Sequence, residues 1–172
     1  MDPTLPSAGP PGDAPQRATL SGRLELVAAL LTAVVGLEFL ALIVGVSGGG
    51  PYRSVGDRIE VVSLNLDAKM ALILLFAAML ATLRDVATAD FDTPRTDVGR
   101  RTLMAVAGLG VVIAVLSLIG VGLDISRSEV TAFGTNTGAA VIHRLAIILM
   151  ASIAAGWALT ALGVRITTAS RS

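Results

Sequence analysis

The chain has no cysteine and only one histidine, His143, among its 172 residues. Without cysteine it cannot form disulfides, thiol nucleophiles, thiolate metal sites or iron–sulfur clusters. One histidine cannot supply a bis-histidine haem site within a single copy, and no second histidine or cysteine is present to complete a metal site with it. We therefore expect no metal and no other cofactor, and we interpret His143 as a polar residue without a ligand role.

Charged and aromatic residues are also scarce. Charged residues make up 15% of the chain, whereas soluble proteins have about a quarter. The 13 basic and 13 acidic residues cancel, so no net field attracts nucleic acid, and we expect no nucleic-acid partner. One Trp, one Tyr and four Phe leave little material for the aromatic belts that anchor helices at a membrane surface.

Long apolar segments account for most of what remains. They cover residues 24–46, 64–83, 103–123 and 140–164. Each meets the length of about 20 residues that crosses a hydrocarbon core of roughly 30 Å. In lipid the backbone must satisfy its own hydrogen bonds, and these segments lack the alternation of barrel strands. The sequence therefore predicts an all-α membrane protein, a bundle of four transmembrane helices.

The flanks and loops predict the orientation. Residues 1–20 hold five of the seven prolines and are expected to form a disordered cytoplasmic tail. Residues 21–166 form the predicted transmembrane domain, and residues 167–172 a second short tail. Eight of the 13 basic residues lie in the two termini and the middle loop, which places both termini in the cytoplasm. Twelve of these 13 are Arg, a bias typical of GC-rich bacterial genomes, so we expect a bacterial plasma membrane protein.

The two outer loops, residues 47–63 and 124–139, share an R-x-E-V pattern. Residues 58–62 alternate polar and β-branched side chains, which predicts a short strand. Pairing of residues 58–62 with residues 127–131 would form a small cap over the outer helix ends. The likeness also fits a duplication of two tandem helical hairpins, and chance similarity of short apolar strings is the alternative. The candidate recognition residues in these loops are Arg58, Glu60, Arg127 and Glu129.

Glu38 is the one acidic residue well inside a predicted span. It lies roughly 12 Å from the outer boundary at about 1.5 Å per residue, where a carboxylate is costly. Lys69 and Arg144 enter from the same side and are its candidate partners. Three interpretations stay open: an ion pair that ties helices together, a proton-coupled transport site, or a contact with a partner.

Small residues recur at four-residue spacing in three of the spans. This spacing lets helix backbones approach closely, within one copy or between copies. The pairs are Ala77/Ala81, Gly110/Ala114, Ala151/Ala155 and Ser152/Gly156.

No motif indicates catalysis. Asp90, Asp92 and Asp97 in the middle loop could gather a hard cation, but the EF-hand spacing is absent and the interleaved arginines neutralise the carboxylates. Thr93 before Pro94 is instead typical of a helix start. No glycine-rich phosphate loop and no G-x-S-x-G elbow is present. We therefore do not expect an enzyme.

Four helices with a glutamate in the first resemble the small multidrug-type exporters in those two respects. Those chains have tight loops and aromatic-rich helices, and this chain has neither. A thiol-dependent four-helix quinone reductase is excluded because cysteine is absent. We expect a non-catalytic accessory or scaffold subunit in the lipid bilayer. It would associate with a protein partner, or as a homo-oligomer, through its outer loops and small-residue helix faces. The alternative is a small oligomeric carrier coupled through Glu38.

Overall fold

The structure is a computed structural model and describes residues 13–47, 54–88, 95–130 and 137–169. These residues form five helices and no strand. The helices are α1 (Asp13–Ser47), α2 (Val55–Leu64), α3 (Ala68–Thr88), α4 (Asp97–Val130) and α5 (Thr137–Ala169). The predicted all-helical class is confirmed for the described residues.

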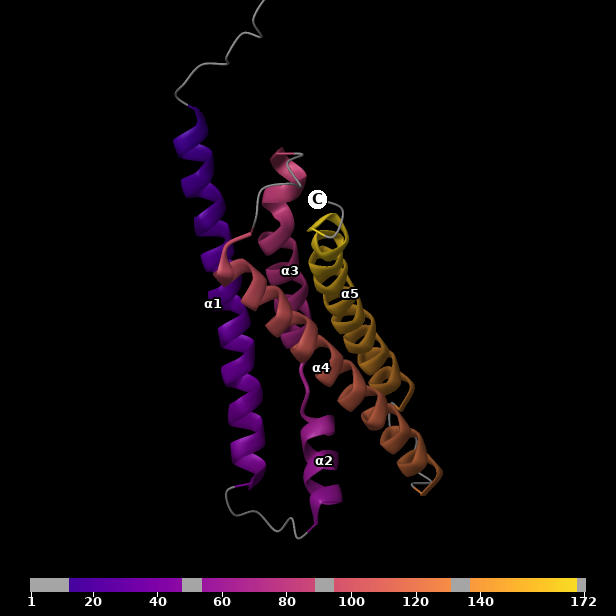
Figure 1. Cartoon of the computed structure of the whole chain (residues 1–172). Helices are drawn as coiled ribbons and strands as arrows, with labels where there is room; N and C mark the ends of the chain where they lie inside the picture. The colour runs from indigo at the N-terminus through magenta and orange to yellow at the C-terminus, as the bar shows by residue number, and fades with distance from the viewer. Residues whose placement is uncertain (1–12, 48–53, 89–94, 131–136, 170–172) are drawn as a thin grey trace, which may run out of the picture.

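The helices are arranged around α3, which lies between α1 and α5 (Figure 1). Helix α4 crosses this layer diagonally, from α1 towards the N-terminal part of α5, and its largest interface is with α5. Within the described part of the chain α1 and α5 do not contact each other, so α3 and α4 hold them together. The start of α1 and the end of α5 lie at the same end of the molecule, and α2 lies at the other end (Figure 1).

Three helices are long and apolar enough to cross a membrane. The candidate spans are Gly22–Ser47 in α1, Asp97–Ser126 in α4 and Gly138–Gly163 in α5. The predicted span at residues 64–83 is not one continuous helix, because α2 and α3 meet there at an angle of 72°. Taken together, α2 and α3 provide a fourth candidate span. The structure thus supports a multi-pass membrane protein with three or four crossings.

Polar side chains between α2 and α3 explain this break. Asn65 ends α2: its Nδ2 donates to the carbonyl of Val61 at 2.8 Å, and its backbone N–H reaches the carbonyls of Val61 and Val62 at 3.2 Å. Asp67 starts α3, since its Oδ1 accepts the backbone N–H of Lys69 at 3.0 Å. Asp67 satisfies an N–H that lacks a partner within its own helix, and the Asn65 side chain adds a second donor to the Val61 carbonyl. The bend is thus stabilised locally.

The predicted strands are wrong, because residues 58–62 lie inside α2 and residues 127–130 in the last turns of α4. Helix α2 begins with a capping box, in which the Ser54 hydroxyl accepts the N–H of Asp57 at 3.0 Å and the Asp57 carboxylate accepts the N–H of Ser54 at 3.1 Å. A cap built from a strand pair therefore does not form, and Thr131 lies outside the described residues.

The predicted disordered tail also needs a partial correction. Helix α1 begins at Asp13, so residues 13–20 are helical, and residues 1–12 lie outside the described residues.

Small residues pack the interior of the bundle. Ala77 and Ala81 of α3 are buried, as are Ala151 and Ala155 of α5. A Cβ atom at Gly110 of α4 would lie 2.8 Å from the Ala151 carbonyl oxygen and 3.1 Å from the Ala155 Cβ, so glycine permits the close approach of α4 to α5. Most of the predicted small-residue positions therefore pack inside one copy, whereas Ser152 and Gly156 stay exposed.

The outer surface of the long helices is apolar. Exposed side chains include Leu30 and Leu37 of α1, Leu118 of α4 and Leu149 of α5. This is the inverse of a water-soluble bundle and matches helices whose outer faces contact lipid. Helix α1 buries the smallest share of its most apolar stretch, 17% against 33% in α4 and 28% in α5. Most of α1 is thus available to lipid or to another protein.

Candidate functional site

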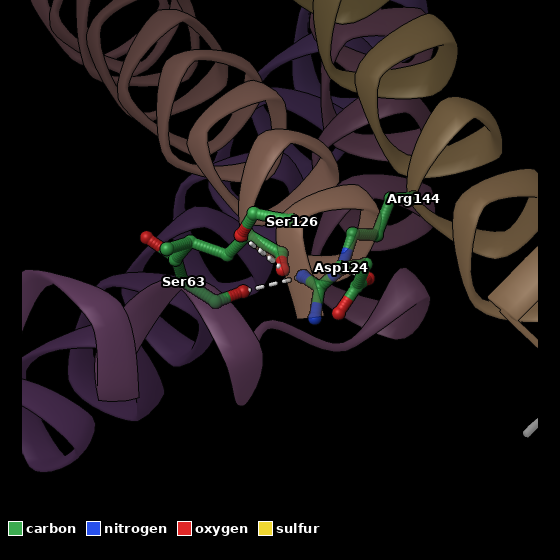
Figure 2. Close-up of polar contacts among 5 residues, drawn as sticks. Ser63, Asp124, Ser126 and Arg144 are labelled. Carbon is green, nitrogen blue, oxygen red and sulfur yellow. Dashed lines mark hydrogen bonds and ion pairs between the residues drawn. The ribbon is translucent and has the colours of Figure 1, made fainter. Parts of the chain in front are cut away.

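Arg144 of α5 is a buried cation that bonds to two other helices. Its Nε donates to Asp124 Oδ2 of α4 at 2.5 Å, and its Nη1 donates to the Ser63 carbonyl of α2 at 2.6 Å. Figure 2 shows the guanidinium between the two acceptors. The side chains of Arg144 and Asp124 are 9% and 14% exposed. One side chain of α5 therefore joins α5 to α4 and to α2.

Local structure explains why this position suits a cation. The Ser63 carbonyl lies in the last turn of α2, where helix carbonyls lose their intrahelical partners and the helix dipole is negative. Gly120 lies one turn before Asp124, and a Cβ atom there would come within 2.5 Å of Arg144 Nη1. Glycine thus leaves the space that the guanidinium occupies. We call Ser63, Gly120, Asp124 and Arg144 the Arg144 cluster.

Glu25 forms a second polar contact at the opposite end of α4. It projects from α1, is 2% exposed, and accepts a hydrogen bond from the Thr96 hydroxyl. The Thr96 hydroxyl in turn accepts the N–H of Gly99 at 3.1 Å and so caps the start of α4. A Cβ atom at Gly99 would lie 2.8 Å from Glu25 Cδ. A carboxylate at a helix N-terminus is favoured by the helix dipole. We call Glu25, Thr96 and Gly99 the Glu25 cluster.

Two further bonds connect α3 to its neighbours. Arg95, just before α4, donates from Nη1 to the Ala81 carbonyl of α3 at 2.8 Å. Trp157 of α5 donates from Nε1 to the Thr82 hydroxyl of α3 at 3.0 Å, and that hydroxyl donates back to the Ala78 carbonyl at 3.0 Å. Together with the two clusters, these bonds give every described helix a polar contact outside itself.

The predicted charge network of Glu38, Lys69 and Arg144 is not brought together. Arg144 is bound to Asp124, as described above. Lys69 forms an ion pair with Asp67 at 3.2 Å, and their side chains are 80% and 47% exposed. Glu38 is exposed on α1 and has no hydrogen bond or ion pair within the described part of the chain.

Asp67 lies in the connection between α2 and α3, outside both helices. Its carboxylate accepts the backbone N–H of Lys69 at 3.0 Å and forms an ion pair with the Lys69 side chain, so it caps the start of α3.

The candidate recognition residues have mixed positions. Arg58 is exposed and Glu60 half-buried, both on α2. Arg127 and Glu129 belong to the last turns of α4, and their side chains lie outside the described residues. The structure therefore places all four on helices, two on α2 and two in the last turns of α4.

Metal-binding candidates give no cluster. Within the described residues no three side chains of His, Cys, Asp or Glu gather where they could hold a metal ion. His143 is exposed near the start of α5, and Asp97 opens α4. Asp90, Asp92, Thr93 and Pro94 lie outside the described residues.

Sequence reasoning overlooked the acidic residues that matter most here, Asp124 and Glu25. A signal for Asp124 was present, because residues 124 and 144 flank one loop between two spans and therefore enter the membrane from the same side. Glu25 gave a weaker signal, since its partner Thr96 lies 71 positions away and no local pattern joins the two.

Comparison of the chain with protein-family models, curated proteins and solved structures gives no match. Functional inference therefore depends on the geometry of the chain itself.

Proposed function

We propose that the chain is a four-span protein of the bacterial plasma membrane that acts as a non-catalytic accessory or scaffold subunit. In this proposal α2 and α3 together make the second crossing, and both termini face the cytoplasm. The observation that carries the proposal is that the buried charged residues of the Arg144 and Glu25 clusters are used to join helices.

The two clusters support a rigid frame. Each buried charge has a partner from another helix: Arg144 has Asp124 and the Ser63 carbonyl, and Glu25 has the Thr96 hydroxyl. Removing one member of such a pair leaves an uncompensated buried charge, so the pairs resist rearrangement. A frame of this kind is suited to presenting fixed surfaces, and less suited to the change of partners that a transport cycle requires.

Helix α2 offers one such surface. Val55 and Ile59 are 74% and 39% exposed, and Arg58 is exposed between them. Apolar and basic side chains on a short ordered helix at one end of the bundle suit contact with a second membrane protein. We therefore place the partner-binding face on α2.

The association is tested with the full-length chain, extracted in mild detergent from the cells that produce it. We expect a second protein to co-purify in a defined ratio, to be lost with Arg58→Glu, and to be retained with the matched variant Arg23→Glu. Arg23 is also exposed, but it lies at the far end of α1. Retention of the second protein in both variants would reject α2 as the contact.

The topology is tested by labelling single cysteines with an impermeant thiol reagent on intact cells. The chain contains no cysteine, so Ser54→Cys and Thr88→Cys each carry a single label site. The proposal expects labelling at Ser54→Cys only, because Ser54 precedes α2 and Thr88 ends α3. Labelling of Thr88→Cys instead would invert the orientation.

A small oligomeric carrier coupled through Glu38 is the second candidate. The observation that favours it is that Glu38 is exposed and has no hydrogen bond or ion pair within the described residues, so its carboxyl group is not committed to joining helices. A carrier would give a pH-dependent flux in liposomes that Glu38→Gln abolishes while the bundle stays folded. Absence of a second protein together with such a flux would replace the scaffold proposal with this one.

A further inference from the structure

Helix α1 carries an exposed stripe that contains Glu38. Its members recur at spacings of seven and of three or four residues and all are exposed: Val27, Val34, Glu38, Ala41 and Gly45. The buried side of α1, with Ala28 and Val35, is used against the rest of the bundle. The stripe is therefore a second face of α1 that the single copy leaves open.

Glu38 has no bonding partner among the described residues of its own copy. It lies nine residues from the end of α1 at Ser47, about 13 Å into the span at 1.5 Å per residue. A carboxyl group at that depth is costly unless it is hydrogen-bonded. The two cations predicted as its partners, Lys69 and Arg144, are bound to Asp67 and Asp124.

The neighbours of Glu38 on the stripe are small. Ala41 and Gly45 are four residues apart, and a Cβ atom at Gly45 would have nothing within 4 Å. The packing of the single copy therefore does not explain a glycine here. Small residues at this spacing let a second backbone come close, and the seven-residue recurrence is the seam of two helices that coil around each other.

We propose that this stripe binds the same stripe of a second copy, with a two-fold axis along the membrane normal. Copies inserted in the same orientation then meet at equal depth, so Glu38 faces Glu38. A protonated carboxyl group donates one hydrogen bond and still accepts others, so the pair satisfies itself without any cation. The stripe is self-complementary in shape, through Ala41 and Gly45, and in hydrogen bonding, through Glu38.

This inference goes beyond the proposed function, because the contact needs no foreign subunit and uses α1, not α2.

Since the chain has no cysteine, single introduced cysteines report the contact between the two copies directly. In native membranes treated with iodine, Ala41→Cys should give a disulfide-linked homodimer, since a disulfide needs Cα atoms about 4.4–6.8 Å apart. Leu40→Cys, exposed at nearly the same depth but about 100° around the helix, should stay monomeric.

Glu38 itself is tested in the Ala41→Cys background. Glu38→Leu should reduce the dimer about tenfold, the loss expected for one hydrogen bond between membrane helices. Glu38→Gln should restore it, because an amide also donates and accepts. The Arg58→Glu variant should keep the dimer even where it loses the second protein, so failure of the two proposals is distinguishable.

Three results would overturn the inference. They are equal crosslinking at positions 40 and 41, a dimer at Ala41→Cys that Glu38→Leu leaves intact, and a crosslinked product with the mass of a different protein.

Discussion

Arg144 and Glu38 are two ionisable residues within apolar helices, and they differ in burial and in bonding. Arg144 is buried and bonded to Asp124 and to the Ser63 carbonyl, whereas Glu38 is exposed and unbonded within the described residues. The difference shows that depth in a span does not by itself fix the role of a charge. A charge on the inner face of its helix joins neighbouring helices, while one on the outer face remains available to lipid, protons or another protein.

The largest expected effect comes from removing the anion beside Arg144. Asp124→Leu leaves a buried guanidinium with only a carbonyl partner, so we expect the free energy of unfolding in detergent to fall by about 3–5 kcal/mol. Denaturant titration followed by circular dichroism measures it. The double variant Asp124→Leu/Arg144→Met removes both charges and should recover most of the loss. If Asp124→Leu were as stable as the parent, the cluster would have no role in stability.

A smaller effect is expected from filling the space beside the guanidinium. Gly120→Ala places a Cβ atom within 2.5 Å of Arg144 Nη1, and overpacking of this kind costs about 1–3 kcal/mol. Gly122→Ala is the matched control, because a Cβ atom there meets nothing within 4 Å and alanine favours helix. The same titration should therefore show a loss for Gly120→Ala and none for Gly122→Ala. Equal stability of the two would place the guanidinium elsewhere.

The cap of α4 should contribute about as much as a typical N-cap. Thr96→Val removes the hydroxyl that caps α4 and donates to Glu25, so we expect a loss of about 1–2 kcal/mol. Thr160→Val is the control, since that exposed hydroxyl donates only to the Gly156 carbonyl of its own helix. Thermal unfolding in detergent compares them. A cap without effect would show that Glu25 is satisfied by another group.

The smallest effect on stability is expected at Glu38. Glu38→Leu removes no bond within the described residues, so the unfolding midpoint of the monomer in dilute detergent should stay unchanged. This outcome, set beside the loss at Asp124→Leu, would complete the contrast between an inner and an outer charge. A large loss at Glu38→Leu would mean that the carboxyl group is bonded within its own copy, and the contrast would fail.

The sequence predicted the class well, because hydropathy is a sum over many residues and tolerates local error. The predicted spans at residues 24–46, 103–123 and 140–164 all lie within long helices. Average hydropathy predicts one span at residues 64–83 because Asn65 and Asp67 add little to the average, yet their side chains end one helix and start another. The period-two pattern of residues 58–62 predicts a strand, but Ser54 and Asp57 just before it form a capping box that starts a helix.

The candidate site was harder to predict than the fold. The position of Glu38 within a span leaves three roles open, an internal ion pair, a transport site and a partner contact, because the side of a helix that faces its neighbours depends on how the helices cross. Asp124 and Arg144 could have been paired from the loop that joins their helices. The approach of Glu25 to Thr96 depends on the diagonal course of α4, which no local pattern encodes.

The bond from Arg144 to the Ser63 carbonyl also has a consequence for biosynthesis. The bend between α2 and α3 is synthesised early. The guanidinium that bonds to its Ser63 carbonyl belongs to the last helix, and Arg144 is synthesised 81 residues after Ser63. Until then the chain is a folding intermediate in which the Ser63 carbonyl lacks its partner, and quality-control proteases can recognise such an intermediate. In a pulse-chase experiment we expect chains ended after α4 to be degraded faster than full-length chains, and full-length Arg144→Met chains to be degraded at an intermediate rate. Equal lifetimes of the three chains would show that the bend between α2 and α3 is stable without the Arg144 bond from α5.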